Sequence, residues 1–393
     1  MTAIVGDQLD SSACVTIAGP PSPSPTNCIK VLHLINGDLY AGAERVQDLL
    51  ASRMGEFGFE LGFACLKSGR FAAVRRSQQT PLFDVRMRSR LDLSIVRRLV
   101  YIIRDGGYCL LHTHSPRAAI VGRVSSALAG VPMVHHLHSP ADAEYKQFWR
   151  NQINGFAERL GWARAAALIA VSHSVADHAR RHGLPARRIS VVHNGVSPQG
   201  PLPERHAPES LWTIGTAALF RPRKGLEVLL EALAILRSQG LPVRLRAVGS
   251  FFTSEYEKQI KAQAARLDLE NAIDWVGFVH DVIGEMRRMD VFVLPSLFGE
   301  GLPMVVLEAM SAGVPVVGTR IEGVPEAVRD GVDGLLAAPG DPGDLARTIA
   351  RVIRREADWS ELRRSAHERQ AGQFSDRSMA AGVAKVYSDV LRR

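Results

Sequence analysis

The chain has 393 residues, 46% of them hydrophobic and 22% charged, and a formal net charge of +8. Its length and apolar content predict two domains rather than one. The sequence contains no uninterrupted apolar run of roughly 18 residues, as a membrane-spanning helix requires, and no basic segment followed by an apolar stretch at its start. We therefore expect a protein that neither spans a membrane nor is exported. The four cysteines form no C-x-x-C pair, which favours a reducing cytoplasm over a disulfide-rich fold.

The positive charge is concentrated in one half of the chain. Residues 27–196 carry 23 basic and 12 acidic side chains, a net charge of +11, whereas residues 197–393 carry 25 and 26, a net charge of −1. A basic half favours an anionic partner, such as nucleic acid, an acidic lipid headgroup or a phosphorylated substrate. Within it, segment 86–104 places apolar residues at helical spacing between arginines. We interpret this segment as an amphipathic helix packed on a sheet, with a helix on an anionic membrane surface as the alternative.

The first half of the chain reads as one α/β domain. Residues 1–27 end in a proline-rich stretch without apolar periodicity, which predicts a disordered leader. Short apolar runs then alternate with segments of helical periodicity from residue 28 to 196. The runs are 28–36, 59–66, 109–114, 131–138, 166–172 and 189–196, and the helical segments include 43–54, 117–130 and 175–183. This alternation predicts a parallel sheet covered by helices on both faces.

The second half repeats the pattern. Residues 197–210 contain four prolines and no apolar periodicity, which predicts a linker. Over residues 211–376 we predict strands at 212–219, 243–249, 272–278, 291–296, 314–319 and 334–338, and helices at 226–236, 255–266, 303–312 and 344–355. Residues 377–393 predict a last helix that crosses back to the first domain. Two doubly wound, Rossmann-like domains in tandem would face each other across a cleft, at the carboxyl ends of their strands.

Residues 290–317, DVFVLPSLFGEGLPMVVLEAMSAGVPVV, are the most informative segment for chemistry. A strand is followed by a loop, and Pro303 stands where a helix begins, because proline lacks the N–H that this position cannot use. The N–H groups of Gly301 and Leu302 would then point out of the helix start and form a site for an anion such as phosphate. Glu300 and Glu308 can both face the same cleft. A carboxylate can accept two hydrogen bonds from a vicinal diol such as that of a ribose.

A second anion signal lies at residues 221–236, RPRKGLEVLLEALAIL. Lys224 and its basic neighbours precede a helix whose leucines recur at helical spacing. Fixed positive charge at a helix N-terminus suits a diphosphate. A solvated basic surface is the alternative. It is the weaker one because segment 290–317 supplies an independent signal for an anion site.

These segments resemble family 4 of the retaining, GT-B-fold glycosyltransferases. The donor-site motif of that family is similar to PSLFGEGLPMVVLEAMSAGVPVV, in which seven residues separate Glu300 from Glu308. Six further segments resemble the family in its order: AGAER at 41–45, HTHSPRA at 112–118, VPMVHHLH at 131–138, HNGV at 193–196, RKG at 223–225 and GVPEAVRDGVDGLL at 323–336. The resemblance implies a GT-B architecture, with an acceptor-binding first domain and a second domain that binds a nucleotide-diphosphate-sugar donor.

The resemblance also implies roles for residues of the second domain. Glu308 would hold the ribose hydroxyls, Lys224 the diphosphate, and the backbone of Val279 the base. Glu300, together with the backbone of Gly301, Leu302 and Pro303, would lie along the sugar and its phosphates. Glu300 and Lys224 would be catalytic residues.

In the first domain, the resemblance implies roles for Gly42 and His138. Gly42 matches the glycine of the loop after the first strand, where the missing side chain lets the backbone approach the donor phosphate. His138 matches the active-site histidine that faces the acceptor.

The chain departs from the family pattern at two places. The family arginine five residues before the lysine is replaced by Leu219, so Arg221 or Arg223 would supply that charge, and we include Arg221 in the donor site. Ala41 replaces the first glycine of the commoner double glycine and narrows the space for the phosphate.

The sequence holds no Asp-x-Asp pair of the kind that binds a divalent metal in many sugar transferases. We therefore expect no metal and no other cofactor, with Lys224, a neighbouring arginine and helix N-termini stabilising the leaving diphosphate. The family retains anomeric configuration. Same-face attack needs no nucleophilic carboxylate and is favoured over a covalent intermediate, with His138 binding sugar hydroxyls instead of acting as the base.

Other interpretations remain at this point. A GT-B nucleotide-sugar epimerase and a non-catalytic nucleotide-sugar-binding protein share the expected scaffold. A dehydrogenase is disfavoured because no G-x-G-x-x-G follows a predicted strand, and nucleic acid is disfavoured because aromatic residues are only 6%. His112, His114, His136 and His138 lie on neighbouring predicted strands and could form a four-nitrogen zinc site.

The basic first domain favours an acceptor carried on a lipid and reached from the cytoplasmic leaflet, with the protein peripheral on the membrane. Assembly of a cell-surface polysaccharide or glycolipid is the setting that we expect.

Overall fold

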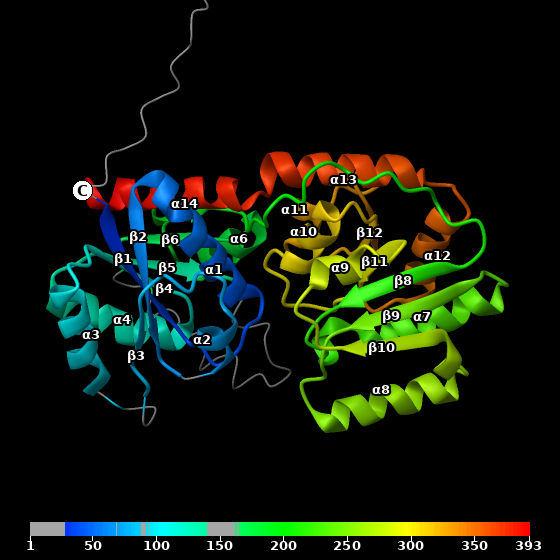
Figure 1. Cartoon of the computed structure of the whole chain (residues 1–393), viewed down its shortest axis with the longest axis horizontal. Coiled ribbons are helices and arrows are strands. Elements are labelled where there is room, and N and C mark those ends of the chain that lie inside the picture. The colour runs from blue at the N-terminus through cyan, green and yellow to red at the C-terminus, as the bar shows by residue number, and fades with distance from the viewer. Residues whose placement is uncertain (1–27, 68, 88–91, 93, 140–161, 163–164) are drawn as a thin grey trace, which may run out of the picture.

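The computed structural model describes residues 28–67, 69–87, 92, 94–139, 162 and 165–393. The predicted leader 1–27 and part of the arginine-rich segment, including Arg88 and Arg90, lie outside the described residues. The chain forms two α/β lobes side by side, each built on one parallel sheet (Figure 1). The predicted fold class, two doubly wound domains, is confirmed.

The first lobe contains a seven-stranded sheet of order β3-β2-β1-β4-β5-β6-β7 in which every neighbouring pair is parallel. Its strands are β1 (Ile29–Ile35), β2 (Phe59–Cys65), β3 (Leu82–Asp84), β4 (Leu110–Thr113), β5 (Met133–Leu137), β6 (Ala167–Ala170) and β7 (Ile189–Val191). Because the order reverses direction between β1 and β4, the carboxyl ends of these two strands flank the position where such sheets bind ligands.

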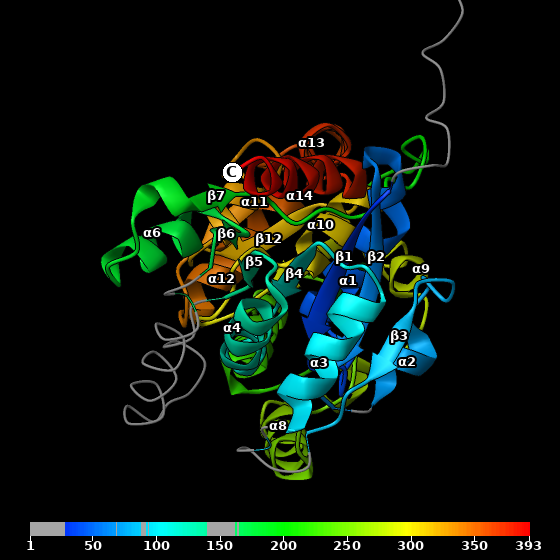
Figure 2. The same ribbon diagram turned by 90° about the vertical axis from the view of Figure 1, so that its left-hand side faces the viewer.

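Helices cover both faces of this sheet. They are α1 (Gly42–Arg53), α2 (Arg70–Val74), α3 (Ser94–Asp105), α4 (Pro116–Ala129) and α6 (His173–Arg181). Side chains of a strand alternate between the faces, so Val31 of β1 packs with α1 while Leu32 and Leu34 pack with α3 and α4. Figure 2 shows α3 and α4 together on one side of the sheet.

The second lobe contains a six-stranded parallel sheet of order β10-β9-β8-β11-β12-β13. Its strands are β8 (Trp212–Ala217), β9 (Val243–Val248), β10 (Ile273–Gly277), β11 (Val291–Leu294), β12 (Val316–Thr319) and β13 (Leu335–Ala337). Its helices are α7 (Leu226–Ser238), α8 (Ser254–Arg266), α9 (Val282–Met286), α10 (Met304–Ser311), α11 (Val324–Ala327), α12 (Pro342–Ile353) and α13 (Trp359–Gln373). Short 3₁₀ helices occur at η1 (Met54–Phe57), η3 (Ala186–Arg188), η4 (Pro222–Lys224) and η5 (Glu270–Ala272).

Of the arginine-rich segment, α3 covers Ser94–Asp105, and Asp92 accepts a hydrogen bond from the Ser94 backbone N–H at 3.1 Å. Two predicted boundaries were wrong. The strand predicted over 189–196 ends at Val191, where the chain leaves the sheet for the second lobe. Pro303 is the N-cap of α10 and not its first residue, since its backbone is extended (ψ 116°).

The last helix, α14 (Asp376–Leu391), returns to the first lobe and lies against α1 and β6. Figure 1 shows it in red across the first sheet, continuing the direction of α13. The chain thus crosses between lobes twice, and the two crossings are paired: the Val196 N–H donates to the Phe374 carbonyl at 2.9 Å, and the Asp376 N–H donates to the Val196 carbonyl at 3.1 Å. Because Gly195 lies directly against the Ser375 backbone, a side chain at this position would collide with it.

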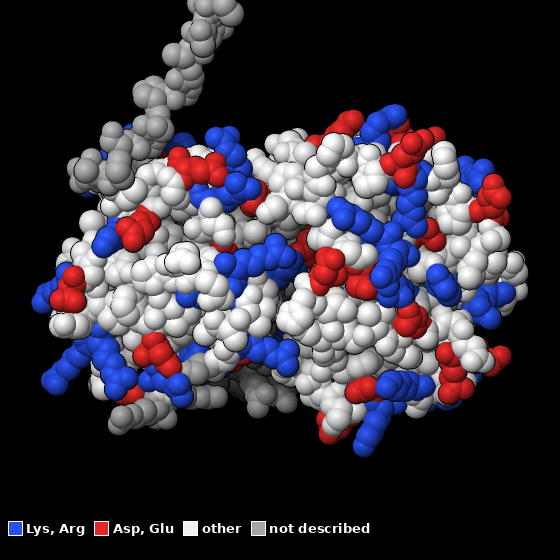
Figure 3. Space-filling model, in the orientation of Figure 1, with Lys and Arg blue, Asp and Glu red and all other residues white. Residues whose placement is uncertain are grey.

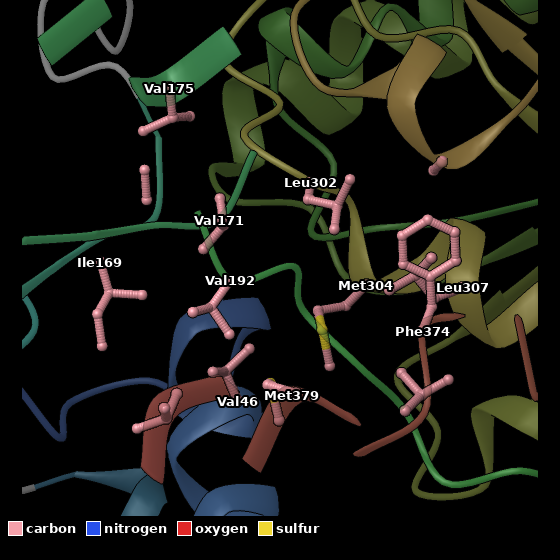
Figure 4. Packing of buried hydrophobic residues seen from close by; sticks show 14 of the residues in the cluster. Val46, Ile169, Val171, Val175, Val192, Leu302, Met304, Leu307, Phe374 and Met379 are labelled. Atoms are coloured by element: carbon pink, nitrogen blue, oxygen red, sulfur yellow. The ribbon is translucent and has the colours of Figure 1, made fainter. Parts of the chain in front are cut away.

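One of the apolar clusters extends across both lobes, and each lobe has further clusters of its own. Figure 4 shows part of the shared cluster, with Val46 and Val171 from the first lobe and Leu302 and Leu307 from the second. None of the helices within the described residues is both long enough and apolar enough to cross a membrane.

Glu326 of α11 provides a polar contact between the lobes. Its carboxylate accepts hydrogen bonds from the backbone N–H groups of His173 (2.7 Å) and Ser174 (2.8 Å), at the start of α6, and lies 3.2 Å from His193 Nε2. Burial raises the pKa of Glu326, but the hydrogen bonds from His193, Ser174 and His173 outweigh burial and bring the pKa below the ordinary 4.5. The ionised carboxylate therefore stabilises the closed arrangement of the lobes.

We expect Glu326→Gln to lower the free energy of unfolding by about 1 kcal/mol at pH 7, because the charge-assisted bonds to α6 are weakened. A carboxyl group with a depressed pKa contributes stability above its ordinary pKa and loses it as the pH falls through the folded value. The difference between wild type and variant should therefore shrink as the pH falls below the ordinary carboxyl pKa of 4.5 and through the lowered value of the folded state. Urea unfolding of both proteins at pH 7 and at low pH measures it, and an equal difference at the two pH values would contradict the assignment.

Candidate functional site

Two helix N-termini from different lobes meet at the centre of the molecule. Gly42 is the first residue of α1, and Met304 is the first residue of α10. The Met304 Cγ lies 3.7 Å from the position that a Cβ of residue 42 would occupy, which is ordinary van der Waals contact. Protein packing alone therefore does not require glycine at position 42. Any such requirement would come from a ligand between the two helix starts, where both helix dipoles favour an anion.

The loop before α10 touches the first lobe through its backbone. A Cβ on Gly301 would overlap the carbonyl oxygen of His138, and a Cβ on Gly323 would overlap the carbonyl oxygen of Gly301. Asn194 donates from Nδ2 to the Leu302 carbonyl at 2.9 Å. The lobes therefore meet at the segment 301–303, and only glycine permits an approach this close.

Figure 3 shows basic side chains on both sides of the hollow between the lobes.

Glu300 and Lys224 form a buried ion pair beside this loop. The Lys224 Nζ donates to Glu300 Oε1, and the Ser296 hydroxyl donates to the same oxygen at 2.6 Å. Burial raises the pKa of Glu300, yet the charges of Lys224 and Arg223 and these hydrogen bonds outweigh burial and leave the pKa below its ordinary value. Burial lowers the pKa of Lys224, and Glu300 opposes that shift. The side chains of the pair are 14% (Lys224) and 6% (Glu300) exposed.

The two arginines before Lys224 have different surroundings. Arg223 donates from Nη1 to the Gly299 carbonyl at 2.8 Å and lies 3.8 Å from Glu300. The guanidinium of Arg221 lies over the Phe252 ring, 5.4 Å from its centroid. Arg223, rather than Arg221, therefore stands next to the Glu300 carboxylate.

Glu308 of α10 is 1% exposed and is bound by a residue of the first lobe. Arg45 of α1 donates from Nη1 to Glu308 Oε2 at 3.0 Å and from Nη2 to Glu308 Oε1. This bidentate pairing joins the lobes and leaves each carboxylate oxygen with further lone pairs for another donor. Glu308 and Glu300 therefore have different cationic partners, one from each lobe.

Glu322 fixes the loop that carries Glu300. Its carboxylate accepts hydrogen bonds from the N–H groups of Gly299 (2.9 Å) and Glu300. Glu322 itself has a φ of 38°, which costs energy for a non-glycine residue. The two backbone hydrogen bonds hold it in this conformation.

Val279, for which the sequence predicts a backbone contact with the base, lies between β10 and α9. It is half-buried against the apolar cluster that extends across both lobes.

Five buried or half-buried imidazoles of the first lobe lie together, and we call them the histidine cluster: His33, His112, His114, His136 and His138. A chain of hydrogen bonds runs from the Tyr387 hydroxyl of α14 to His33 Nε2 (2.9 Å), from His33 Nδ1 to His114 Nε2 (3.0 Å) and from His114 Nδ1 to His138 Nε2 (3.1 Å). The His112 Nδ1 lies 2.6 Å from the same hydroxyl. Burial lowers the pKa of His33 to about 3 and that of His138 to about 4, so the rings are neutral at pH 7.

Comparison with known proteins decides the family. Residues 40–199 match the family described as Glycosyltransferase Family 4, and residues 203–371 match Glycosyl transferases group 1. The D-inositol 3-phosphate glycosyltransferase of Streptomyces bingchenggensis is 30% identical over 322 residues, which cover 74% of this chain and 68% of that protein. The chain belongs to the group 1, family 4 glycosyltransferases. The amylovoran biosynthesis glycosyltransferase AmsK of Erwinia amylovora is 35% identical over 184 residues, 45% of this chain but only 44% of that protein's length.

Among solved structures, HepE of Anabaena in complex with UDP-glucose superposes with a TM-score of 0.81, at 24% identity, over 92% of this chain and 100% of that one. This similarity shows that the two share a fold, the GT-B fold. The sequence-based assignment of family and fold is therefore confirmed.

Sequence reasoning missed Arg45, Glu322, His33 and Tyr387. Arg45 lies inside the quoted segment AGAER, but its partner Glu308 is 263 residues away. His33 of β1 pairs with His112 of β4 and lies on the same face of the sheet. The alternation of side chains along β1 could have indicated that His33 joins the other histidines. Nothing in the sequence indicates that Tyr387 of the last helix meets them.

We expect the Arg45–Glu308 pair to show strong coupling in a double-mutant cycle. Removal of one partner leaves a largely buried charge without its counterion, so Arg45→Met should cost about 2 kcal/mol of unfolding free energy. In the Arg45→Met, Glu308→Gln double variant the buried charge is gone, and the total cost should be smaller than the sum of the two single costs. Urea unfolding measures all four proteins, and additive costs would contradict the pairing.

Proposed function

We propose that this chain is a retaining glycosyltransferase of the hexosyltransferase type. It moves a sugar from a nucleotide-diphosphate-sugar donor to an acceptor hydroxyl without a metal. The observation that supports this most directly is the set of groups at the start of α10: the Lys224–Glu300 pair, the buried Glu308 carboxylate, and the facing helix start at Gly42. This set combines an anion site with a carboxylate suited to a ribose diol.

In the proposed complex, the diphosphate lies between the starts of α1 and α10. Lys224 and Arg223 stabilise the negative charge that the leaving diphosphate acquires as the anomeric C–O bond breaks. Glu300 keeps the Lys224 ammonium charged and in position, and Glu308, held by Arg45, accepts the ribose hydroxyls. Val279 contacts the base through its backbone. These cations and helix dipoles supply the stabilisation that a divalent metal gives in other transferases.

Retention of configuration is proposed to occur by same-face attack. In this route the departing phosphate oxygen takes the proton of the acceptor hydroxyl, so no protein base is needed at the acceptor. His138, whose Nε2 is bonded to His114, binds sugar hydroxyls. Glu300 is already engaged by Lys224 and Ser296, which makes it a poor covalent nucleophile.

The comparisons support the donor and setting. HepE was solved in complex with UDP and with UDP-glucose, and AmsK is described as an enzyme of amylovoran biosynthesis. We infer from these relatives that the donor is a UDP-sugar or a similar nucleotide sugar, and that the acceptor is a glycan or a lipid-linked glycan of a cell-surface polysaccharide.

The experiment that tests this function is a screen of UDP-, GDP- and ADP-sugars for donor hydrolysis and transfer, with and without EDTA. We expect one donor to be consumed at the same rate in EDTA, and Lys224→Met to lower kcat about 100-fold because the leaving group loses its cation. Complete loss of activity in EDTA, restored by Mg²⁺ or Mn²⁺, would reject the metal-free mechanism. Free isomerised sugar nucleotide without acceptor would indicate an epimerase.

Gly42→Ala is the variant that separates binding from folding. Alanine at the first turn of α1 is tolerated by the surrounding protein and has the higher helix propensity, so the unfolding free energy should not fall. The added methyl group lies where the donor phosphate is proposed, and KM for the donor should rise. An unchanged KM would place the phosphate elsewhere.

We further propose that α3 and α4 form a surface for an anionic membrane. The apolar face of α3, with Leu99 and Ile103, is buried on the sheet, as the packed-helix interpretation requires. The outer surface instead offers Tyr101 (67% exposed) and three residues of α4 spaced four apart: Ile120, Val124 and Leu128. Exposed Arg97 and Arg104, together with Asp105, lie beside Tyr101 and Leu128, and basic side chains gather over α3 at the lower left of Figure 3. Apolar groups bordered by arginines suit an interface with acidic lipid.

Flotation with vesicles tests this surface. The protein should bind vesicles that contain phosphatidylglycerol and not vesicles of phosphatidylcholine alone. The double variant Tyr101→Ser, Leu128→Ser should bind roughly tenfold less, because two inserted apolar side chains are lost. Val332→Ser, at an exposed apolar residue of the second lobe (45% exposed), is the control. Equal recovery with both lipids, or equal binding by the two variants, would count against the surface.

A further inference from the structure

The histidine cluster contains ring nitrogens that hydrogen bonding within the protein leaves unused. Within the described residues, no partner is found for either nitrogen of His136, for Nε2 of His112 or for Nδ1 of His138. His136 is only 2% exposed, and its ring is stacked between those of His112 and His138 at 5.3 and 4.4 Å. A buried nitrogen without a partner costs about 1–3 kcal/mol, so a ring with two of them needs a reason.

Three rings of the cluster converge on one point. His114, His136 and His138 each direct one nitrogen to a common region, and these three atoms lie within 4.8 Å of one another. The His114 Nδ1 and His138 Nε2 are 3.1 Å apart. Two nitrogens bound to a tetrahedral zinc ion at about 2.05 Å stand roughly 3.3 Å apart. A small outward shift of these two rings would therefore admit an ion in place of their hydrogen bond.

The outer partners of these rings suit metal ligation. With its Nδ1 on a metal, His114 carries its proton on Nε2 and donates it to His33 Nδ1, which is 3.0 Å away. His33 then donates from Nε2 to the Tyr387 oxygen, and the Tyr387 hydroxyl donates to His112 Nδ1. Burial raises the pKa of Tyr387, so its proton is retained. Every link of the chain has one donor and one acceptor, as in the outer shells that orient metal-bound imidazoles.

We propose that His114, His136 and His138 bind one divalent transition-metal ion of the zinc type. The ligand set contains only neutral imidazoles, without a carboxylate or thiolate among the described residues of the group, and imidazole favours zinc, cobalt, nickel and copper over magnesium or calcium. His138 is half-buried, and its carbonyl lies at the contact between the lobes, against Gly301. Zinc bound here removes His138 from the acceptor and inhibits transfer, a consequence that rests on the proposed function.

Cobalt titration of metal-free protein tests the site without any enzymatic assay. We expect one equivalent of Co²⁺ to bind and to give the intense visible absorption of a four-coordinate ion, and Zn²⁺ to displace it. His136→Phe keeps the ring stacking but offers no nitrogen, and it should abolish the spectrum. His135→Asn is the matched control, since His135 is the adjacent buried residue of β5 and bonds to Thr113 on the other face.

Each outcome decides one part of the proposal. Absence of the four-coordinate spectrum in the wild type, or its persistence in His136→Phe, overturns the site. Zn²⁺ should also slow sugar transfer by the wild type, reversibly on addition of EDTA, and should not slow it in His136→Phe. If cobalt binds but zinc leaves transfer unaffected, the inhibitory role is wrong. If cobalt binds and no nucleotide sugar is consumed, the proposed function fails while the metal site stands.

Discussion

The buried Lys224–Glu300 ion pair is the interaction on which the proposed chemistry depends. An ammonium group withdrawn from water keeps its charge only beside an anion, and Glu300 with Ser296 provides that environment at the start of α10. Glu322 in turn holds the backbone of Gly299 and Glu300, at the expense of its own left-handed conformation. The cationic end of the site is thus built by the second lobe alone, before any ligand arrives.

The first lobe contributes specific polar and backbone contacts in addition to the apolar cluster that both lobes share. Arg45 reaches Glu308, Gly301 lies against the His138 carbonyl, and Glu326 caps α6. All three join a residue of one lobe to a residue of the other. Because α14 and the segment before β8 cross between lobes side by side, a hinge at this place would separate all three contacts together. Ligand entry and lobe opening are therefore expected to be one process.

Part of this architecture could be predicted from local sequence. Continuous apolar runs gave the strands, and Pro303 with Glu300 and Glu308 indicated the helix start. Helix α13 was missed because its buried face includes Arg363 and Gln370, so the apolar periodicity is broken; Arg363 is buried by donating to the carbonyls of Gly313, Pro203 and Arg205. Strand β3 was missed because it has three residues at the sheet edge and is only partly buried. Pairs such as Arg45–Glu308 and His33–Tyr387 leave no local signal, since only the fold brings their partners together.

The central claim is that protein cations and helix dipoles alone neutralise the diphosphate of a nucleotide sugar. A crystal structure with UDP or another accepted nucleoside diphosphate, grown in the presence of EDTA, tests it most directly. The account predicts the distal phosphate within hydrogen-bond distance of the Lys224 ammonium and of the backbone before α10, and the ribose hydroxyls on Glu308. A diphosphate bound away from Lys224 would contradict it.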